Sequence, residues 1–311
     1  MVTKRRNIFI AILLVVSSAG FFLSQEMFGV AERRVINVDG IERSYVVYAP
    51  KSDAGSKQPV VIVLHGGGES AEYMINATGW SDKAQEENFI VVFPEGTRPN
   101  PAIPAELQTN QQTWADGADR FYHHTERGVD DVAFIDALLD EVIVLFNADE
   151  KKIFVTGFSN GASMTLRLGV ELSDRIAAIG PVAGGLWSHN LKLERSVSLI
   201  YISGTADPLP TEIEVAFGDT TKKIEAPHQD IGEIWARMLS CSKRTAENST
   251  SKNTTLLAWS DCKDGSRVHT YTIEGLGHVW PRKGDMLETS SGVLKSKFEA
   301  TDAIWEFFDT M

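Results

Sequence analysis

The sequence predicts one α/β domain with a mostly parallel sheet, helices on both faces and an N-terminal antiparallel hairpin. Short apolar runs recur along the chain, helical stretches separate them, and an Asp-Gly pair joins two early strand-like segments. Apolar runs without alternation are typical of strands that are buried on both faces. Strands that alternate with helices indicate a parallel sheet covered on both sides.

The expected strands follow one another in a regular order. Val35–Val38 and Tyr45–Tyr48 flank Asp39-Gly40, and this pair predicts a tight hairpin because glycine tolerates a positive φ. The buried strands are expected at Val60–Leu64, Ile90–Phe93, Ile153–Thr156, Ile176–Val182 and Leu199–Ser203, and Val268–Ile273 is a further strand candidate.

Helical spacing of apolar residues marks the segments between these strands. Helices are expected at Val129–Phe146, Asn160–Leu172, Ile231–Leu239 and Glu299–Phe308. Residues 97–128 lack any such period and are rich in Pro, Gln and Asp. We expect this long insertion to be a surface loop near a functional site rather than a linker.

Composition excludes several classes of protein and of partner. The chain has 311 residues, of which 43% are hydrophobic and 23% charged, and these values exclude a collagen, a coiled coil and a multi-span membrane protein. A net charge of −12 argues against a nucleic-acid partner, because binding phosphates needs a surplus of Lys and Arg on one face. Two cysteines are too few for a thiolate metal cluster, and we expect no metal and no cofactor.

Residues 1–31 differ in kind from the rest of the chain. Lys4, Arg5 and Arg6 precede an apolar run from Ile8 to Leu23, and small residues follow it. This order is typical of a secretory signal peptide, but an uncleaved N-terminal anchor remains the alternative, and only then would the protein contact a membrane. In either case we expect residues 32–311 to be exported to a secreted or periplasmic location. We predict that these residues form one domain.

Export changes what is expected of Cys241 and Cys262. An oxidising compartment favours a disulfide between them. In the loop-entropy description such a bond stabilises the fold by about 3 kcal/mol. Two unpaired buried thiols are the alternative.

The sequence Gly157-Phe158-Ser159-Asn160-Gly161 lies between an expected strand and an expected helix. A Gly-x-Ser-x-Gly motif in this context predicts a sharp turn that lifts the serine hydroxyl above the sheet edge. Ser159 is therefore the candidate nucleophile, and the N–H of Asn160 would face the reacting oxygen. A structural serine that only caps the helix is the alternative.

Glycines also follow the first buried strand, in His65-Gly66-Gly67-Gly68. Successive glycines let backbone N–H groups approach a ligand closely, so Gly67 and Gly68 are candidate oxyanion donors. One such donor lowers the barrier by about 2.7–4 kcal/mol in enzymes studied by mutagenesis. His65 is expected to brace the loop, and a merely flexible turn is the alternative.

Two further strands are each followed by a chemically useful side chain. Asp207 comes soon after Leu199–Ser203, and His278 lies in a glycine-lined loop after Val268–Ile273. A carboxylate at this edge can fix the tautomer of a histidine, which can then take a proton from Ser159. Other residues of these types fit less well. These rivals are Asp219, Asp230 and Asp261 for the carboxylate, and His123, His124, His189, His228 and His269 for the base.

The order Ser159, Asp207, His278 is that of the α/β hydrolases. With these motifs the chain resembles the secreted polyhydroxybutyrate depolymerase and feruloyl/acetylxylan esterase group of that superfamily. The matching segments are Leu64–Gly68, Val129–Val132, Val155–Ala162, Pro181–Gly184, Gly204–Pro208 and Gly277–Pro281. The resemblance implies an α/β-hydrolase fold, a Ser-His-Asp triad, and oxyanion donors from the glycine loop and Asn160. It also makes a bridge between the two cysteines plausible.

The chain departs from this group at Ser203 and Arg282, where many members carry His and Gly. The substrate specificity of the group is therefore a poor guide to the substrate of this chain. Many depolymerases add a polymer-binding domain, whereas this chain ends at Met311, which favours soluble esters or short oligomers as substrates. Tryptophans in expected loops at the same sheet edge are candidate substrate-binding residues: Trp114, Trp187 and Trp280. Ordinary burial is an equal alternative for Trp187.

The sequence thus predicts a secreted serine carboxylesterase that acts on hydroxyalkanoate, feruloyl or acetyl-sugar esters through an acyl-enzyme. An acyltransferase that passes the acyl group to a sugar or lipid alcohol is the alternative on the same fold. A non-catalytic binding protein is a weaker alternative, because it would have no use for a general base.

Overall fold

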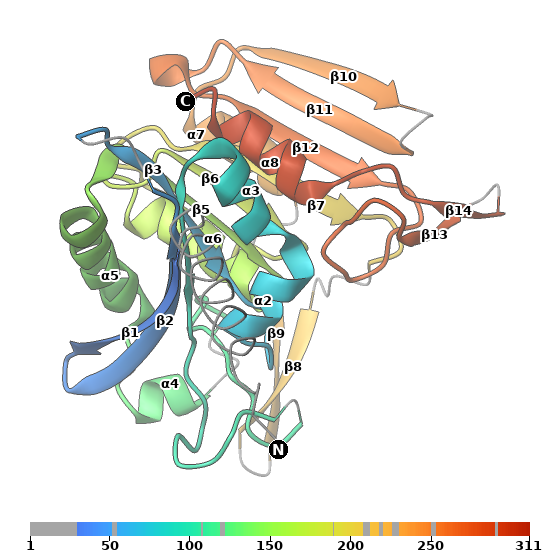
Figure 1. Ribbon diagram of the computed structural model, residues 1–311. Helices are drawn as coiled ribbons and strands as arrows, with labels where there is room; N and C mark the ends of the chain where they lie inside the picture. The colour runs from blue at the N-terminus through green and yellow to red at the C-terminus, as the bar shows by residue number, and fades with distance from the viewer. Residues whose placement is uncertain are drawn as a thin grey trace, which may run out of the picture.

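The computed structural model describes residues 30–51, 55–106, 108–118, 122–188, 190–207, 212–217, 220–225, 230–249, 253–289 and 292–311 (Figure 1). Residues 1–29, which carry most of the predicted signal peptide or anchor, lie outside these ranges. Val30 and Ala31 already belong to the first strand, where they pair with Ala49 and Tyr48. Within the described ranges no helix is both long enough and apolar enough to cross a membrane.

The described residues form a ten-stranded mixed sheet in the order β1-β2-β4-β3-β5-β6-β7-β12-β11-β10. The six strands from β4 to β12 in this order are mutually parallel, whereas β1 and β2 at one side and β11 and β10 at the other are antiparallel to their neighbours. The bounds are β1 Val30–Val38, β2 Ile41–Ala49, β3 Gln58–Leu64, β4 Ile90–Pro94, β5 Ala148–Phe158, β6 Ala178–Val182, β7 Ser198–Gly204, β10 Lys243–Ser249, β11 Thr254–Ser260 and β12 Val268–Ile273.

Two layers of helices cover the two faces of this sheet (Figure 1). The helices α5, α6 and α7 pack on one face, and α2, α3 and α8 pack on the other. Their bounds are α2 Ala71–Thr78, α3 Trp80–Glu87, α5 Asp131–Phe146, α6 Asn160–Glu171, α7 Ile231–Met238 and α8 Ala300–Phe308, and the short helix α4 spans Tyr122–Glu126.

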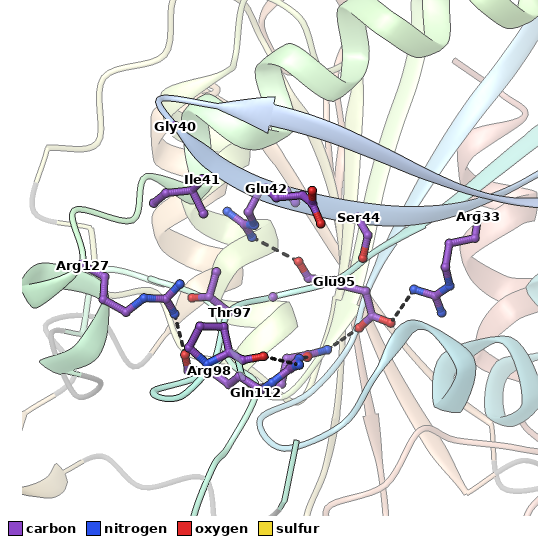
Figure 2. Close-up of a pocket in the computed structure, with 13 residues that line it drawn as sticks. Arg33, Gly40, Ile41, Glu42, Ser44, Glu95, Thr97, Arg98, Gln112 and Arg127 are labelled. Carbon is purple, nitrogen blue, oxygen red and sulfur yellow. Dashed lines mark hydrogen bonds and ion pairs between the residues drawn. The ribbon is translucent and has the colours of Figure 1, made fainter. Parts of the chain in front are cut away.

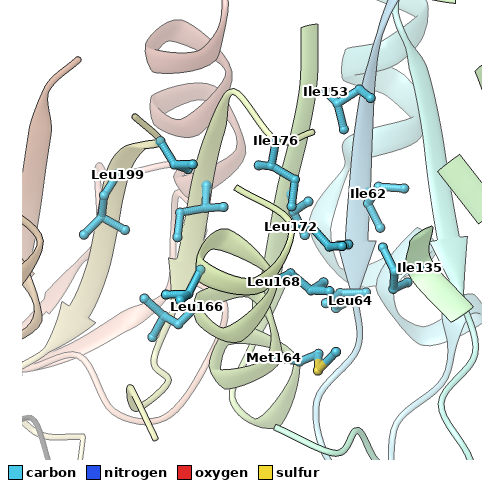
Figure 3. Packing of buried hydrophobic residues seen from close by; sticks show 14 of the residues in the cluster. Ile62, Leu64, Ile135, Ile153, Met164, Leu166, Leu168, Leu172, Ile176 and Leu199 are labelled. Carbon is cyan, nitrogen blue, oxygen red and sulfur yellow. The ribbon is translucent and has the colours of Figure 1, made fainter. Parts of the chain in front are cut away.

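Strand β3 shows why the central strands read as unbroken apolar runs. Ile62 and Leu64 point into the core under α5 and α6, whereas Val61 and Val63 point into the core under α2, α3 and α8. Side chains alternate between the faces of a strand, so a strand covered on both sides needs apolar residues at every position. Figure 3 shows the first of these cores, with Ile62 and Leu64 beside Met164 and Leu168 of α6. The predicted fold class is confirmed.

The antiparallel strands at the far edge were not predicted from the sequence. Strand β10 is almost wholly exposed and carries polar side chains, so it lacks the apolar signal of the buried strands. Two small hairpins were also missed: β8 Glu212–Phe217 with β9 Thr220–Glu225, and β13 Met286–Thr289 with β14 Gly292–Lys295. The strand expected at Ile176–Val182 begins at Ala178.

The predicted disulfide between Cys241 and Cys262 is present. Cys241 follows α7, and Cys262 follows β11. The bond therefore ties the antiparallel edge of the sheet to the helix layer at a place where the strands themselves bury little apolar surface.

Candidate active site

Ser159 stands at a sharp turn between β5 and α6. Its backbone has φ 54° and ψ −116°, a conformation that costs a non-glycine residue free energy and is typical of functional sites. The N–H of Ser159 donates to the carbonyl of Val182 over 3.0 Å, which holds the turn against β6. A Cβ at Gly157 would lie 2.6 Å from the carbonyl oxygen of Gly161, so the turn requires glycine there.

The structure brings together the three residues that the sequence predicted as a triad. The Nε2 of His278 lies 2.8 Å from the Oγ of Ser159. The Nδ1 of the same ring lies 3.0 Å from both carboxylate oxygens of Asp207. A carboxylate at Nδ1 places the ring proton there and leaves Nε2 as an acceptor for the serine hydroxyl. The geometry is that of a nucleophile, a base and an orienting acid.

Main-chain hydrogen bonds join the loop that carries Asp207 to the loop that carries His278. The N–H groups of Thr205 and Ala206 donate to the carbonyls of Ile273 and Leu276, each over 3.0 Å. These bonds fix the distance between the two side chains. Asp207 is 1% exposed at its side chain, whereas His278 is 39% exposed.

The rival carboxylates have structural roles or lie outside the described residues. Asp230 caps α7 by accepting the N–H of Glu233, and Asp261 pairs with Lys243. Asp219 is not among the described residues, and neither are His189 and His228.

The glycine loop leaves one of the two candidate oxyanion donors free. The N–H of Gly68 donates to the carbonyl of Gln112 over 2.7 Å, so the prediction for Gly68 is wrong. The N–H of Gly66 donates to the carboxylate of Glu69 over 2.8 Å. Within the described ranges the N–H of Gly67 has no acceptor. A Cβ at Gly67 would lie 3.7 Å from that of Asn160, so the backbones of the two predicted donors, Gly67 and Asn160, are neighbours.

The side chain of Asn160 has a structural role that sequence reasoning missed. Its Oδ1 accepts the N–H of Trp114 over 2.7 Å, and its Nδ2 donates to the carbonyl of Trp114 over 3.1 Å and to Asp116 over 2.8 Å. These bonds fasten the 97–128 insertion to the start of α6. An amide side chain directly after the motif serine was the only sequence signal for this role.

His65 braces the oxyanion loop, as predicted. Its Nδ1 lies 2.8 Å from the carbonyl of Gly66, and its Nε2 accepts the N–H of Gly96 over 2.9 Å. The ring is fully buried, and this burial lowers the pKa of His65 below its ordinary value. A neutral His65 with its proton on Nδ1 satisfies both contacts.

Glu69 is a second side chain beside the site that sequence reasoning missed. Burial raises the pKa of its carboxyl, although its bond to Gly66 and the nearby His278 act in the opposite direction. Its position one residue after the three glycines was the only signal available.

The three tryptophans predicted to bind substrate are buried instead. Trp114 is fully buried, and its Nε1 donates to the carbonyl of His65 over 2.9 Å. Trp280 is 7% exposed, and its Nε1 donates to the hydroxyl of Thr301 over 3.3 Å. Trp187 is 4% exposed and packs beside Gly117. A substrate wall needs accessible rings, so these three predictions are corrected to packing roles.

His123 and His124, two of the rivals for the base, are buried in the short helix α4. Their rings are tilted by 33° with centroids 4.1 Å apart, and the residues are 3% and 5% exposed. Among the described residues no group of three or more His, Cys, Asp or Glu side chains is arranged to hold a metal ion.

Known proteins resemble this chain along most of its length. The family described as Phospholipase/Carboxylesterase matches residues 46–229, which is more than half of the chain. The chain belongs to this phospholipase/carboxylesterase family. The predicted resemblance to esterases of the α/β-hydrolase superfamily is confirmed.

Two curated relatives of this chain are named as esterases. The bifunctional acetylxylan esterase/xylanase XynS20E of Neocallimastix patriciarum is 25% identical over 241 residues, which are 77% of this chain and 31% of that protein. The putative esterase NocK of Nocardia uniformis subsp. tsuyamanensis is 28% identical over 274 residues, which are 80% of this chain and 73% of that protein. The chain thus spans less than a third of the first relative and about three quarters of the second.

A solved structure shares the fold. The acetyl xylan esterase from Aspergillus awamori superimposes with a TM-score of 0.61 at 16% identity, and the match covers 90% of this chain and all of that one.

Proposed function

We propose that this protein is a serine carboxylesterase in which Ser159 is the nucleophile, His278 the general base and Asp207 the residue that orients it. The observation that carries the proposal is the continuous hydrogen-bond path from Asp207 through His278 to Ser159. Membership of the phospholipase/carboxylesterase family supports the same reaction class.

The first half of the reaction forms an acyl-enzyme. The Oγ of Ser159 attacks the ester carbonyl carbon while its proton passes to Nε2 of His278. The negative charge that develops on the carbonyl oxygen is held by the N–H groups of Gly67 and Asn160. The carbon–oxygen bond to the alcohol then breaks, and the imidazolium returns its proton to the departing alcohol oxygen.

The second half regenerates the enzyme. A water molecule gives a proton to Nε2 of His278, and its oxygen attacks the acyl carbon on Ser159. The same two N–H groups hold the second oxyanion. Its collapse releases the carboxylic acid, and the proton on His278 returns to the serine oxygen.

The proposed substrates are soluble or oligomeric carboxylic esters of the hydroxyalkanoate, feruloyl or acetyl-sugar type. The proposed place of action is outside the cytoplasm. The signal-like order of residues 1–31 and the Cys241–Cys262 disulfide support export.

The decisive test removes the nucleophile. Ser159→Ala should lower kcat for p-nitrophenyl acetate or butyrate by about 10⁶-fold, the effect of losing the serine in a well-studied protease. It should also abolish labelling by a fluorophosphonate probe. Ser196→Ala is the matched control, because within the described ranges this hydroxyl donates to Asp264 alone, away from the triad.

Turnover that survives in Ser159→Ala would refute the assignment. Circular dichroism and thermal unfolding of the variant should match those of the wild type, so that loss of activity is not loss of fold. Product analysis with added alcohols would show how much acyl group passes to an alcohol instead of water.

A further inference from the structure

A recess of about 590 Å³ lies beside the oxyanion loop, between the β1–β2 hairpin and the segment that follows β4 (Figure 2). Four arginines line it: Arg33, Arg43, Arg98 and Arg127. Two carboxylates, Glu42 and Glu95, line it as well. On a chain whose net charge is −12, this local surplus of positive charge is unusual.

Two of the four arginines are neutralised by carboxylates. Arg43 is 3% exposed at its side chain and pairs with the fully buried Asp131 over 2.7 Å. Arg33 pairs with Glu95 over 3.5 Å. Their charges are therefore largely compensated within the protein.

The other two arginines face neutral oxygens alone within the described ranges. Arg98 donates to the carbonyls of Pro101 and Ile103 and to the side-chain oxygen of Gln112. Arg127 donates once, over 2.5 Å, to the carbonyl of Arg98. A guanidinium carries five N–H donors, so both side chains keep donors for a ligand. Glu42, an exposed residue near the start of β2, is the carboxylate of the described lining that has no ion pair there.

The recess is close to the reaction centre. The segment Glu95–Arg98 follows β4, the glycine loop follows β3, and Ser159 follows β5. These strands are neighbours in the order β4-β3-β5, so their carboxyl ends lie at one edge of the sheet. Two strand spacings, roughly 10 Å, separate β4 from β5, so the wall of the recess formed by Glu95–Arg98 begins at about that distance from Ser159.

Gln112 is the physical link between the two places. Its carbonyl accepts the N–H of Gly68 in the oxyanion loop, while its side chain bonds Arg98 in the recess. The oxyanion loop and the recess therefore adjoin at Gln112, the loop at its main chain and the recess at its side chain.

We propose that this recess is a carboxylate-binding subsite, which receives the far end of an ester substrate whose scissile carbonyl lies at Ser159. Arg98 and Arg127 supply the charge, and a carboxylate matches the paired donors of a guanidinium. The proposal rests on the proposed esterase function and adds a substrate class to it, namely half-esters and oligomers that carry a free carboxylate.

The test compares substrates that differ only in charge. Monoethyl esters of linear dicarboxylic acids of increasing length are compared with the same esters in which the free acid is a primary amide. Above a threshold length, the wild type should show a KM about three- to tenfold lower for the carboxylate than for the amide. The difference should shrink in high salt, because mobile ions screen exposed charges.

Arg127→Gln should abolish this preference for the carboxylate, since it removes the charge while keeping an amide donor toward Arg98. Arg237→Gln is the matched control: it makes the same change in net charge on exposed α7, which packs under β7 and β12. It should keep the preference.

Equal KM values for acid and amide at every length would overturn the subsite, and so would a preference that survives in Arg127→Gln. A free dicarboxylate that raises the melting temperature of the wild type without any such preference would assign the recess to a free anion instead. Wild-type hydrolysis of the amide esters reports on the esterase itself. Absence of that hydrolysis would indicate failure of the proposed function rather than of the subsite.

Discussion

The nucleophile side and the acid–base side of the candidate site are held in place by different means. On the nucleophile side, buried side chains such as His65 and Asn160 bond the backbone of neighbouring loops. On the acid–base side, the loops of Asp207 and His278 are joined mainly by main-chain bonds, and the imidazole is partly exposed.

Because of this difference, we expect residues on the two sides to contribute differently to activity and to stability. A buried polar side chain that holds a backbone leaves unpaired groups behind when it is removed, so it contributes to both properties. A partly exposed side chain on a main-chain scaffold can be changed with little effect on the fold. Substitutions on the acid–base side should therefore lower activity with little change in stability, whereas substitutions on the nucleophile side should lower both.

After loss of the Ser159 hydroxyl itself, the largest effect on activity is expected from Asp207→Asn. The amide cannot favour the Nδ1–H tautomer of His278, and the same replacement in a well-studied serine protease lowers kcat by about 10⁴-fold. The main-chain bonds of Thr205 and Ala206 do not involve the carboxylate, so the thermal unfolding midpoint should stay close to that of the wild type. Steady-state kinetics and differential scanning calorimetry measure the two quantities.

His278→Asn serves as the companion variant on the same side. Its amide can still donate toward the buried carboxylate of Asp207 but cannot act as a base, so the variant should be at least as inactive as Asp207→Asn and about as stable as the wild type. A clear fall in the unfolding temperature of both variants would show that the acid–base side also carries the fold, and the contrast between the two sides would disappear.

The sequence was most informative about the acid–base side and the nucleophile itself. Ser159 and Asp207 each follow a strand with an apolar run, and His278 follows Val268–Ile273, a further strand candidate, so their meeting at one edge could be predicted. The contacts that hold the oxyanion loop in place could not be predicted. The bond between Gly68 and Gln112 joins two loops far apart in sequence, and no periodicity encodes such a contact. The same reason explains why Trp114 and Trp280 were misassigned, because burial of a loop residue depends on what folds over it.

Asn160→Ala should lower both activity and stability. The side chain bonds the N–H and the carbonyl of the buried Trp114, and loss of such partners costs about 1–3 kcal/mol of unfolding free energy. The N–H of residue 160 remains, but the loop around it would shift, and a displacement of about 1 Å can cost 10²-fold in rate. Urea unfolding measures the change in unfolding free energy, and kcat/KM measures the change in activity.

Asp116→Asn is the matched control for this variant. It keeps a side-chain oxygen for the Nδ2 of Asn160 while removing one charge. Its stability should lie closer to the wild type than that of Asn160→Ala. An Asn160→Ala protein as stable as the wild type would mean that the amide does not hold the insertion.

The fold as a whole was predictable where burial on two faces leaves an apolar signature. The central strands from β4 to β7 in the order of the sheet have that signature, and so do α5 and α6. Strand β10 could not be found in the same way, because an exposed edge strand needs no apolar residue. The short helices α2 and α3 were also missed, because α2 buries only Ala71, Met74 and Thr78 and α3 only Trp80 and Ala84, so each presents little apolar periodicity.

The smallest effect is expected from pH, acting on the nucleophile side through His124. Its ring bonds the hydroxyls of Thr97 and Thr113, whose backbones pair with each other just before Trp114. Burial lowers the pKa of His124 from 6.5 to about 4, and nearby His123, Arg43 and Arg127 act in the same direction, against Asp131. Between pH 6.5 and about 4 the unfolded chain therefore binds a proton that the folded protein does not.

The unfolding free energy should accordingly fall as the pH is lowered through this window, by up to about 1.4 kcal/mol per pH unit for one such group. His124→Asn, which keeps a donor and an acceptor, should show a shallower slope in urea unfolding between pH 6.5 and 4. Burial lowers the pKa of His269 in β12 to about 4 as well, so His269→Asn should flatten the slope equally. Amide exchange separates the two histidines: protection of the Thr97 and Thr113 N–H groups should fall with pH in His269→Asn but less in His124→Asn. Equal loss of protection in both variants would mean that His124 does not hold this half of the site.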